Sequence, residues 1–131
     1  MQLRPTSPLR TTEQIDAAIE LLAAHPEADS VRTVTPPEQS PYKMYKIGDD
    51  GYLAPLLTLP GEPESFNWPN QKLPKTYKHV GYLDVAWRKT LQDKGKMTGD
   101  VILPLIIENA QSGINTPEDW ERYEYLMSKA K

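Results

Sequence analysis

Apolar and polar residues follow a helical period in the first part of this chain. Thr11 and Gln14 have the spacing of a capping box, in which each residue's side chain satisfies a backbone N–H of the other. Apolar residues then recur every three or four positions, at Ile15, Ala18, Ile19 and Leu22. This spacing predicts an amphipathic helix that begins after Thr11 and ends at His25 and Pro26.

The period then shortens to that of strands. Residues 30–35 (SVRTVT) are rich in β-branched side chains and precede two prolines, which predicts a strand that runs into a loop. Residues 42–47 and 52–57 flank the turn-rich tetrad 48–51, which predicts a β-hairpin. Pro55 favours an edge or short position for its second strand. Asp49 and Asp50 are interpreted as turn residues and not as metal ligands.

The second half of the chain continues the alternation of strands and helices. Residues 60–74 hold four prolines without periodicity, which predicts an irregular segment. A strand over 76–85, a short helix over 86–92 and a strand over 101–107 are expected next, and the last should be buried because its run is apolar on both faces. Thr116, Pro117 and the acids after them open a final helix with Trp120, Tyr123 and Met127 on one face.

This order predicts an α/β fold with a partial, mixed sheet, flanking helices and a β-rich arm. With 131 residues, we expect a single domain built on one core. A net charge of −3 argues against nucleic acid and anionic membranes as partners. The absence of cysteine is compatible with the cytoplasm, where we expect the protein. Neither a signal peptide nor a spanning helix is expected.

The most unusual segment for chemistry is 4–10 (RPTSPLR), which combines two prolines, two arginines and two hydroxyls just before the first helix. Such a loop could hold an anion, although a terminus without a ligand is the alternative. Lys43, expected at the start of a strand, could meet a carboxylate or phosphate or simply face solvent. His25 and His79 have no partner at metal-ligand spacing, so no metal site is expected from them.

Several segments, in this order, resemble the acylneuraminate cytidylyltransferase family. The matching stretches are 4–10 (RPTSPLR), 28–35 (ADSVRTVT), 40–44 (SPYKM), 73–75 (LPK), 80–85 (VGYLDV) and 115–120 (NTPEDW). The resemblance implies a partial Rossmann-like nucleotidyltransferase fold and the transfer of CMP from CTP to an acidic sugar such as sialic acid, with Mg²⁺ in the intact family. It also implies a homodimer formed through an arm at about residues 40–85.

The same resemblance assigns substrate-binding roles. Arg4, Thr6, Ser7 and Arg10 are expected to line the sugar or nucleotide cleft, Lys43 to face the sugar carboxylate, and Gln71 and Lys75 to contact substrate. Relatives usually carry Gln at the position of Arg4 and Arg at that of Asn70, so the sugar itself is left unnamed. The positions of the family's two metal carboxylates are Gly113 and Asn115, so no metal site and no catalytic residue are assigned here.

The chain resembles only the C-terminal half of family members, and nothing in it resembles their Gly-rich phosphate loop. The leading hypothesis is therefore a family member without catalysis as an isolated chain. The alternative is an oligomerisation or sugar-binding module derived from the family. A third hypothesis, in which a separate chain supplies the missing half, is weakened by Gly113 and Asn115.

Overall fold

The computed structural model describes residues 1–129, which form two compact units. The first unit joins Met1–Thr35 to the residues from His79 onward, and the second is Pro36–Lys78. The first unit contains β1 (Gln2–Leu3), α1 (Thr12–Ala24), β2 (Ser30–Thr35), β5 (Lys78–Ala86, from its second residue on), α2 (Arg88–Gln92), β6 (Ile102–Ile106) and α3 (Pro117–Lys129). The second contains the short strands β3 (Tyr45–Ile47) and β4 (Leu53–Pro55) and three 3₁₀ turns, η1 (Pro41–Lys43), η2 (Ser65–Asn67) and η3 (Asn70–Lys72).

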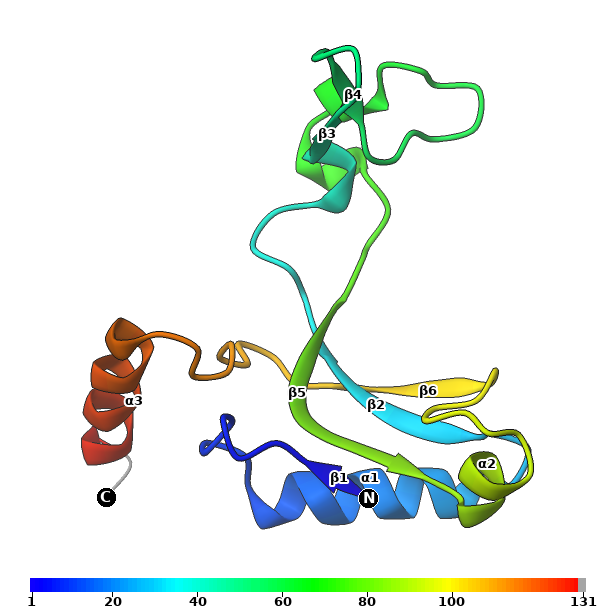
Figure 1. Cartoon of the computed structure of the whole chain (residues 1–131), viewed down its shortest axis with the longest axis vertical. Helices are drawn as coiled ribbons and strands as arrows, with labels where there is room; N and C mark the ends of the chain where they lie inside the picture. The colour runs from blue at the N-terminus through cyan, green and yellow to red at the C-terminus, as the bar shows by residue number, and fades with distance from the viewer. Residues whose placement is uncertain (130–131) are drawn as a thin grey trace. The chain divides into compact units, whose positions relative to one another are not determined.

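A four-stranded sheet organises the first unit, with strand order β1-β5-β2-β6 (Figure 1). β1 pairs antiparallel with β5, whereas β2 pairs parallel with β6, so the sheet is mixed. α1 packs on one face, where buried side chains from the helix and the strands form the core, namely Ala18, Leu22, Ala28, Val31, Leu83 and Val85. The predicted mixed α/β architecture is confirmed.

Both ends of α1 follow the sequence pattern. The Thr11 hydroxyl accepts a hydrogen bond from the Gln14 backbone N–H, and the Gln14 side chain accepts one from the Thr11 N–H, which completes the predicted capping box. The helix ends at Ala24, and the ring Nδ1 of His25 lies 2.9 Å from the Leu21 carbonyl oxygen. His25 therefore has a helix-end role.

β6 differs from its prediction, because it is an exposed edge strand and not a buried one. Leu103 and Leu105 pack against the core, whereas Ile102 and Ile106 are 41% and 44% exposed. No strand pairs beyond β6 in the described sheet, and only one of its faces is covered. An apolar run on both faces was therefore a poor guide to burial here.

The loop before β6 is hydrogen-bonded to the side chain of Asp29. The Asp29 carboxylate accepts hydrogen bonds from Lys94 Nζ, the Asp100 N–H and the Val101 N–H, each at 2.8 to 3.0 Å. Gly99, with φ of +72°, passes so close that a Cβ there would lie 2.3 Å from the Asp29 Cβ. Asp29 thus holds the loop at the start of β6, and only glycine fits at position 99.

The second unit contains the predicted hairpin in a shorter form. β3 and β4 pair antiparallel over three residues each, and the turn between them has Gly51 at φ +81° and the Asp50 carboxylate accepting from the Tyr52 N–H. Lys43 lies in η1 and not at the start of a strand, because Ser40 and Pro41 begin a 3₁₀ turn there.

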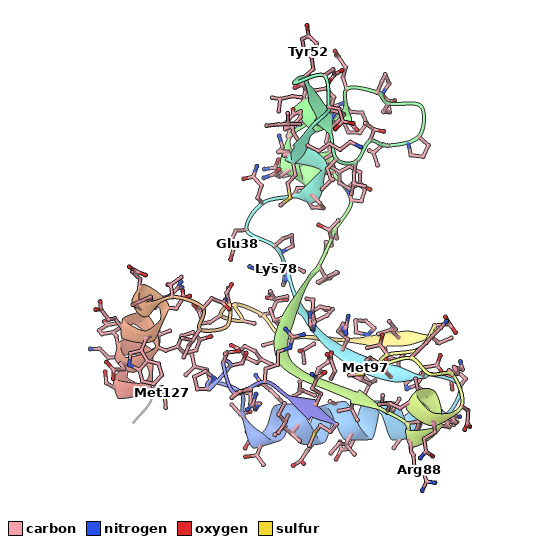
Figure 2. The ribbon with its side chains drawn as sticks, viewed as in Figure 1. Glu38, Tyr52, Lys78, Arg88, Met97 and Met127 are labelled. Atoms are coloured by element: carbon pink, nitrogen blue, oxygen red, sulfur yellow. The ribbon has the colours of Figure 1, made fainter. Side chains whose placement is uncertain are left out.

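Tyr45 and Phe66 make an edge-to-face ring contact at 5.7 Å within this unit. Near its two chain ends, Lys78 Nζ donates to the Glu38 carboxylate at 2.8 Å, and Figure 2 labels both residues. The unit overlaps the expected arm at 40–85, but residues 79–85 belong to β5 of the sheet.

Across residues 1–129, no helix has both the length and the apolar character needed to cross a membrane.

Candidate functional site

The loop over residues 4–10 connects β1 to α1 and is tied to the sheet by Arg10. Arg10 Nη1 donates to the Arg4 carbonyl at 2.7 Å and to the Tyr82 carbonyl in β5 at 3.0 Å. The Ser7 N–H also donates to the Arg4 carbonyl, at 3.2 Å. Through these two hydrogen bonds, Arg10 ties the loop to β5, and its predicted place in a substrate cleft stays a prediction.

The segment that follows β6 meets this loop. The Ile114 N–H donates to the Thr6 carbonyl at 2.8 Å, and the Gln111 N–H donates to the Tyr82 hydroxyl. A Cβ at Gly113 would lie 3.3 Å from both the carbonyl oxygen and the hydroxyl of Thr6. The sequence-predicted residues Thr6 and Ser7 are therefore brought together with Gly113.

The loop over 4–10 and the segment after β6 meet at the end of the sheet where β1 and β6 have their carboxyl ends. In Figure 1, β1 and β6 both end toward the left of the view, where these two segments begin. Ligand sites in open α/β sheets lie at the carboxyl ends of strands, where chain segments diverge. Ser7 is 1% exposed, and its hydroxyl has no hydrogen-bond partner among residues 1–129. The carboxyl end of the sheet is therefore the candidate functional site.

Arg4 lies across β5 at Gly81. A Cβ on Gly81 would be 2.6 Å from the Arg4 Cδ and 3.3 Å from its Nη1, so the Arg4 side chain occupies the space that any other residue at 81 would fill. Arg4 is exposed, and within the described residues its guanidinium has no hydrogen bond or ion pair. It is a cation available to a ligand.

Three more charged or titratable groups lie on the two central strands, β2 and β5. Arg32 in β2 and Asp84 in β5 form a two-point ion pair, with Nε to Oδ1 at 3.0 Å and Nη2 to Oδ2 at 3.3 Å. His79 Nε2 lies 3.5 Å from the same Asp84 Oδ1. Burial lowers the pKa of His79, Arg32 and Arg4 lower it further, and Asp84 opposes them. Two guanidinium groups against one carboxylate leave this cluster cationic when His79 is neutral.

An apolar cavity of about 300 Å³ lies beside the loop, between it and α3. Pro5, Pro8, Ile114, Tyr123 and Met127 contribute to its lining, together with Trp120 and Glu124. Tyr123 is buried, and its hydroxyl donates to the Ser112 carbonyl, whereas Trp120 is 57% exposed. The predicted apolar face of α3 is thus only partly covered.

The positions expected for metal carboxylates do not fit a magnesium site. Gly113 has no side chain, and the Asn115 amide donates to the Gly113 carbonyl at 3.0 Å. Asp119 Oδ2 accepts from the backbone N–H groups of Asn115 and Thr116, so this carboxylate caps α3. No group of three or more His, Cys, Asp or Glu residues able to hold a metal occurs within residues 1–129. Mg²⁺ prefers carboxylate oxygens, which these positions do not supply.

The other sequence-predicted residues belong to the second unit. Lys43 is half-buried in η1, Gln71 lies exposed in η3, and Lys75 is exposed in the segment that follows. None of the three side chains makes a hydrogen bond or ion pair within the described residues. All three belong to the second unit, whereas Arg4, Arg32, His79 and Asp84 belong to the first.

The prediction from sequence missed Arg32, Asp84 and Gly81 and treated His79 as an ordinary strand residue. A signal was present, because Arg32 interrupts the β-branched run of β2 and Asp84 interrupts the apolar run of β5. Charged side chains are seldom buried unless they are paired, so opposite charges in two strongly predicted strands indicate a cross-strand pair.

No protein-family model matches this chain, and no curated protein matches its sequence.

Proposed function

We propose that this chain recognises an acidic sugar as a relative of the acylneuraminate cytidylyltransferases and does not catalyse nucleotide transfer as an isolated chain. The observation that carries the proposal is the unpaired guanidinium of Arg4, the first residue of the loop over 4–10 whose sequence resembles the family's. A guanidinium matches the planar geometry of a carboxylate, which is the charged group of an acidic sugar.

The proposed lack of catalysis rests on the chain's lacking groups that nucleotide transfer needs. CMP transfer requires charge stabilisation at the phosphates of CTP, which enzymes supply with oriented N–H groups, cations and metal ions. The 131 residues contain no Gly-rich basic phosphate loop. Gly113 and Asn115 bring no carboxylate for Mg²⁺, and Asp119 is engaged at the start of α3. We also propose that the four-stranded sheet is part of a Rossmann-like nucleotidyltransferase fold.

The first experiment measures binding of N-acetylneuraminate to the whole chain by calorimetry, with its methyl ester as the matched ligand that lacks the charge. We expect the acid to bind and the ester to bind at least tenfold more weakly, since a charge-assisted hydrogen bond contributes about 1.5–3 kcal/mol. Equal binding of acid and ester would contradict the proposal.

The second experiment tests catalysis directly. The pure chain is incubated with CTP, Mg²⁺ and a panel of acidic sugars, and pyrophosphate release is measured. We expect no release above the rate without protein. Release that depends on the chain and on one sugar would overturn the proposed lack of catalysis.

Oligomerisation through the second unit is the other candidate function. Ile47 and Leu53 are register partners in the hairpin and are 74% and 68% exposed, and Tyr52 beside them is 74% exposed. Figure 2 shows the Tyr52 side chain pointing away from the ribbon. Exposed apolar residues gathered in this way are typical of protein interfaces.

Light scattering tests this candidate. We expect a dimeric mass at micromolar concentration and a monomeric mass for Ile47→Thr combined with Leu53→Thr. Tyr125→Thr, at an exposed position of α3, is the control that should stay dimeric. A monomeric wild-type chain would count against oligomerisation.

A further inference from the structure

We infer that Arg4, Arg32 and His79 form one oxyanion site on the sheet, that Gly81 makes room for it, and that His79 takes up a proton when the anion binds. The inference deepens the proposed function, because it assigns the residues and the proton linkage of the same site. Its chemistry applies to a carboxylate or to a tetrahedral oxyanion such as phosphate.

Gly81 allows the site to exist. The Arg4 side chain lies on the β5 backbone at Gly81, with Nε and Nη1 3.2 and 3.3 Å from where a Cβ would stand. Gly81 has no positive φ, so its conformation is open to alanine. The lack of a side chain is therefore explained by the close approach of Arg4 and not by the backbone. Alanine at this position would push the guanidinium off the strand.

Arg4, Arg32 and His79 differ in the contacts that they already make within the protein. Arg32 makes two hydrogen bonds to Asp84, so it contributes to the site mainly through its positive charge and not through free hydrogen-bond donors. The Arg4 guanidinium makes no hydrogen bond or ion pair within residues 1–129, so it supplies the free hydrogen-bond donors. His79 is anchored near Asp84 Oδ1 and has a side chain that is 30% exposed. An anion that pairs with Arg4 therefore enters a field that is already positive.

Proton uptake follows from the groups around His79, which are Asp84 in β5, Arg32 in β2 and Arg4 after β1. Burial and the two guanidinium groups lower the pKa of His79, while Asp84 raises it. A bound anion adds negative charge and offsets the Arg4 and Arg32 fields, so the pKa of His79 rises on binding. By linkage, affinity is highest at pH values below the pKa of the free protein and falls as pH rises through the two pKa values.

The size of the effect follows from the same linkage. If the anion raises the pKa of His79 by about one, the affinity at low pH exceeds the affinity at high pH about tenfold. The relevant window lies below pH 6.5, the ordinary pKa of histidine, because burial and the neighbouring guanidinium groups lower the pKa of His79 in the free protein.

The chain is well suited to a direct measurement because it has only two histidines. His25→Gln leaves His79 as the single imidazole, and its NMR titration is recorded without ligand, with N-acetylneuraminate and with inorganic sulfate. Both probes keep a constant charge between pH 4.5 and 8, a range that covers the lowered pKa of His79. We expect a ligand-dependent rise in the pKa of His79. An unchanged titration under saturating ligand would overturn the proton linkage.

Affinity measurements on variants test the site itself. We expect Arg4→Gln to weaken binding of the acid at least tenfold, Gly81→Ala to weaken it several-fold, and His79→Gln to bind with little dependence on pH. His25→Gln should retain wild-type affinity and pH dependence. Unchanged affinity in Arg4→Gln overturns the site, and unchanged affinity in Gly81→Ala overturns the role of Gly81.

The two probes separate this inference from the proposed function. Sulfate binding with a rise in the His79 pKa, without binding of the acidic sugar, would support the oxyanion site and contradict sugar recognition. Sugar binding that leaves the His79 titration unmoved would support the proposed function and overturn the proton linkage.

Discussion

Thr33 joins the two central strands through its side chain. Its hydroxyl is fully buried, lies 2.7 Å from the Val80 carbonyl and 3.0 Å from that of Leu83, and accepts from the Leu83 N–H. Its loss would leave these backbone groups short of a partner in the core.

We expect Thr33→Val to lower the free energy of unfolding by about 1–3 kcal/mol, because the shape is kept while a buried N–H loses its acceptor. Thr35→Val is the matched control, since Thr35 is buried in the same strand and its hydroxyl makes no hydrogen bond within the described residues. Urea unfolding of both variants gives the comparison. Equal losses would contradict this role of the Thr33 hydroxyl.

Asp29 makes stability depend on pH. Its hydrogen bond with Lys94 holds the pKa of this carboxyl well below its ordinary value, and the backbone N–H groups of Val101 and Asp100 lower it further. A depressed pKa in the folded state stabilises the protein above the unfolded value, which is about 3.9. That contribution is lost as pH falls below 4.

We therefore expect Asp29→Asn to lower the Tm at pH 7 and to flatten the loss of Tm between pH 4 and pH 2.5. Asp93→Asn, an exposed acid with no such contacts, should behave as wild type. Thermal unfolding at a series of pH values measures both. A parallel acid-induced loss in Asp29→Asn and wild type would exclude Asp29 as a source of the acid sensitivity.

Residue roles were only partly predictable from the sequence. The loop over 4–10 is chemically unusual in the sequence, and the structure places it at the carboxyl end of the sheet. Arg10 is expected to line the cleft, and the structure adds that its Nη1 donates to the Arg4 and Tyr82 carbonyls. A pattern shows which groups are present, but not which of them the fold itself uses.

Among the elements, α1 supplies most of the helical contribution to the core. Leu22 is 3% exposed in the core, whereas Ile19 in the same helix is 44% exposed. We expect Leu22→Ala to destabilise the protein by about 2–5 kcal/mol, because it leaves a cavity. Ile19→Ala should cost well under half of that. Similar losses in urea unfolding would contradict the packing of α1 described here.

The free edge of β6 is protected by a proline. Val101 and Ile107 direct a backbone group to β2, so the even-numbered residues between them direct theirs to the open edge. Pro104 lies at the middle of that edge and has no N–H to offer a further strand. Edge strands commonly carry such a residue against unwanted pairing.

We expect Pro104→Val to increase association of the chain, because the new N–H completes the donor row of an edge that also exposes Ile102 and Ile106. Concentration-dependent light scattering and thioflavin fluorescence measure this. Leu103→Val is the control, since its backbone and side chain face inward. A Pro104→Val chain that associates no more than the control would argue against this protective role.

Element types were predictable where a local pattern determines them, as for the capped helix α1 and the β-branched strand β2. Burial of β6 was not, because it depends on how many strands pair beyond it, which no local pattern encodes. The two-residue β1 was missed for a similar reason, since it is a strand only through its partner β5. Pro41 shortened the hairpin by starting a 3₁₀ turn.

At the scale of the whole molecule, the second unit is an insertion between two neighbouring strands. β2 ends at Thr35 and β5 begins at Lys78, and the two strands are adjacent in the sheet. The sequence offered no boundary at this point, because residues 76–85 read as one continuous strand. Insertions of this kind are tolerated where their ends lie close together.

We expect the first unit to fold when Pro36–Lys78 is replaced by a short Gly-Asn-Gly-Ser linker, since its core contains no residue of the second unit. Circular dichroism should keep the helical signal, and thermal unfolding should remain cooperative. A replacement of the same length, with a Gly-Ser-rich segment, controls for loop length. Loss of cooperative unfolding in both would show that the sheet depends on the second unit.

The three tryptophans are distributed so that each part of the molecule carries its own optical reporter. Trp68 lies half-buried in the second unit, Trp87 packs against the core of the sheet, and Trp120 stands largely exposed on α3 beside the apolar cavity. Their emission therefore comes from three distinct environments. Chains that retain a single tryptophan would separate unfolding of the inserted unit, unfolding of the core and detachment of the last helix into three signals.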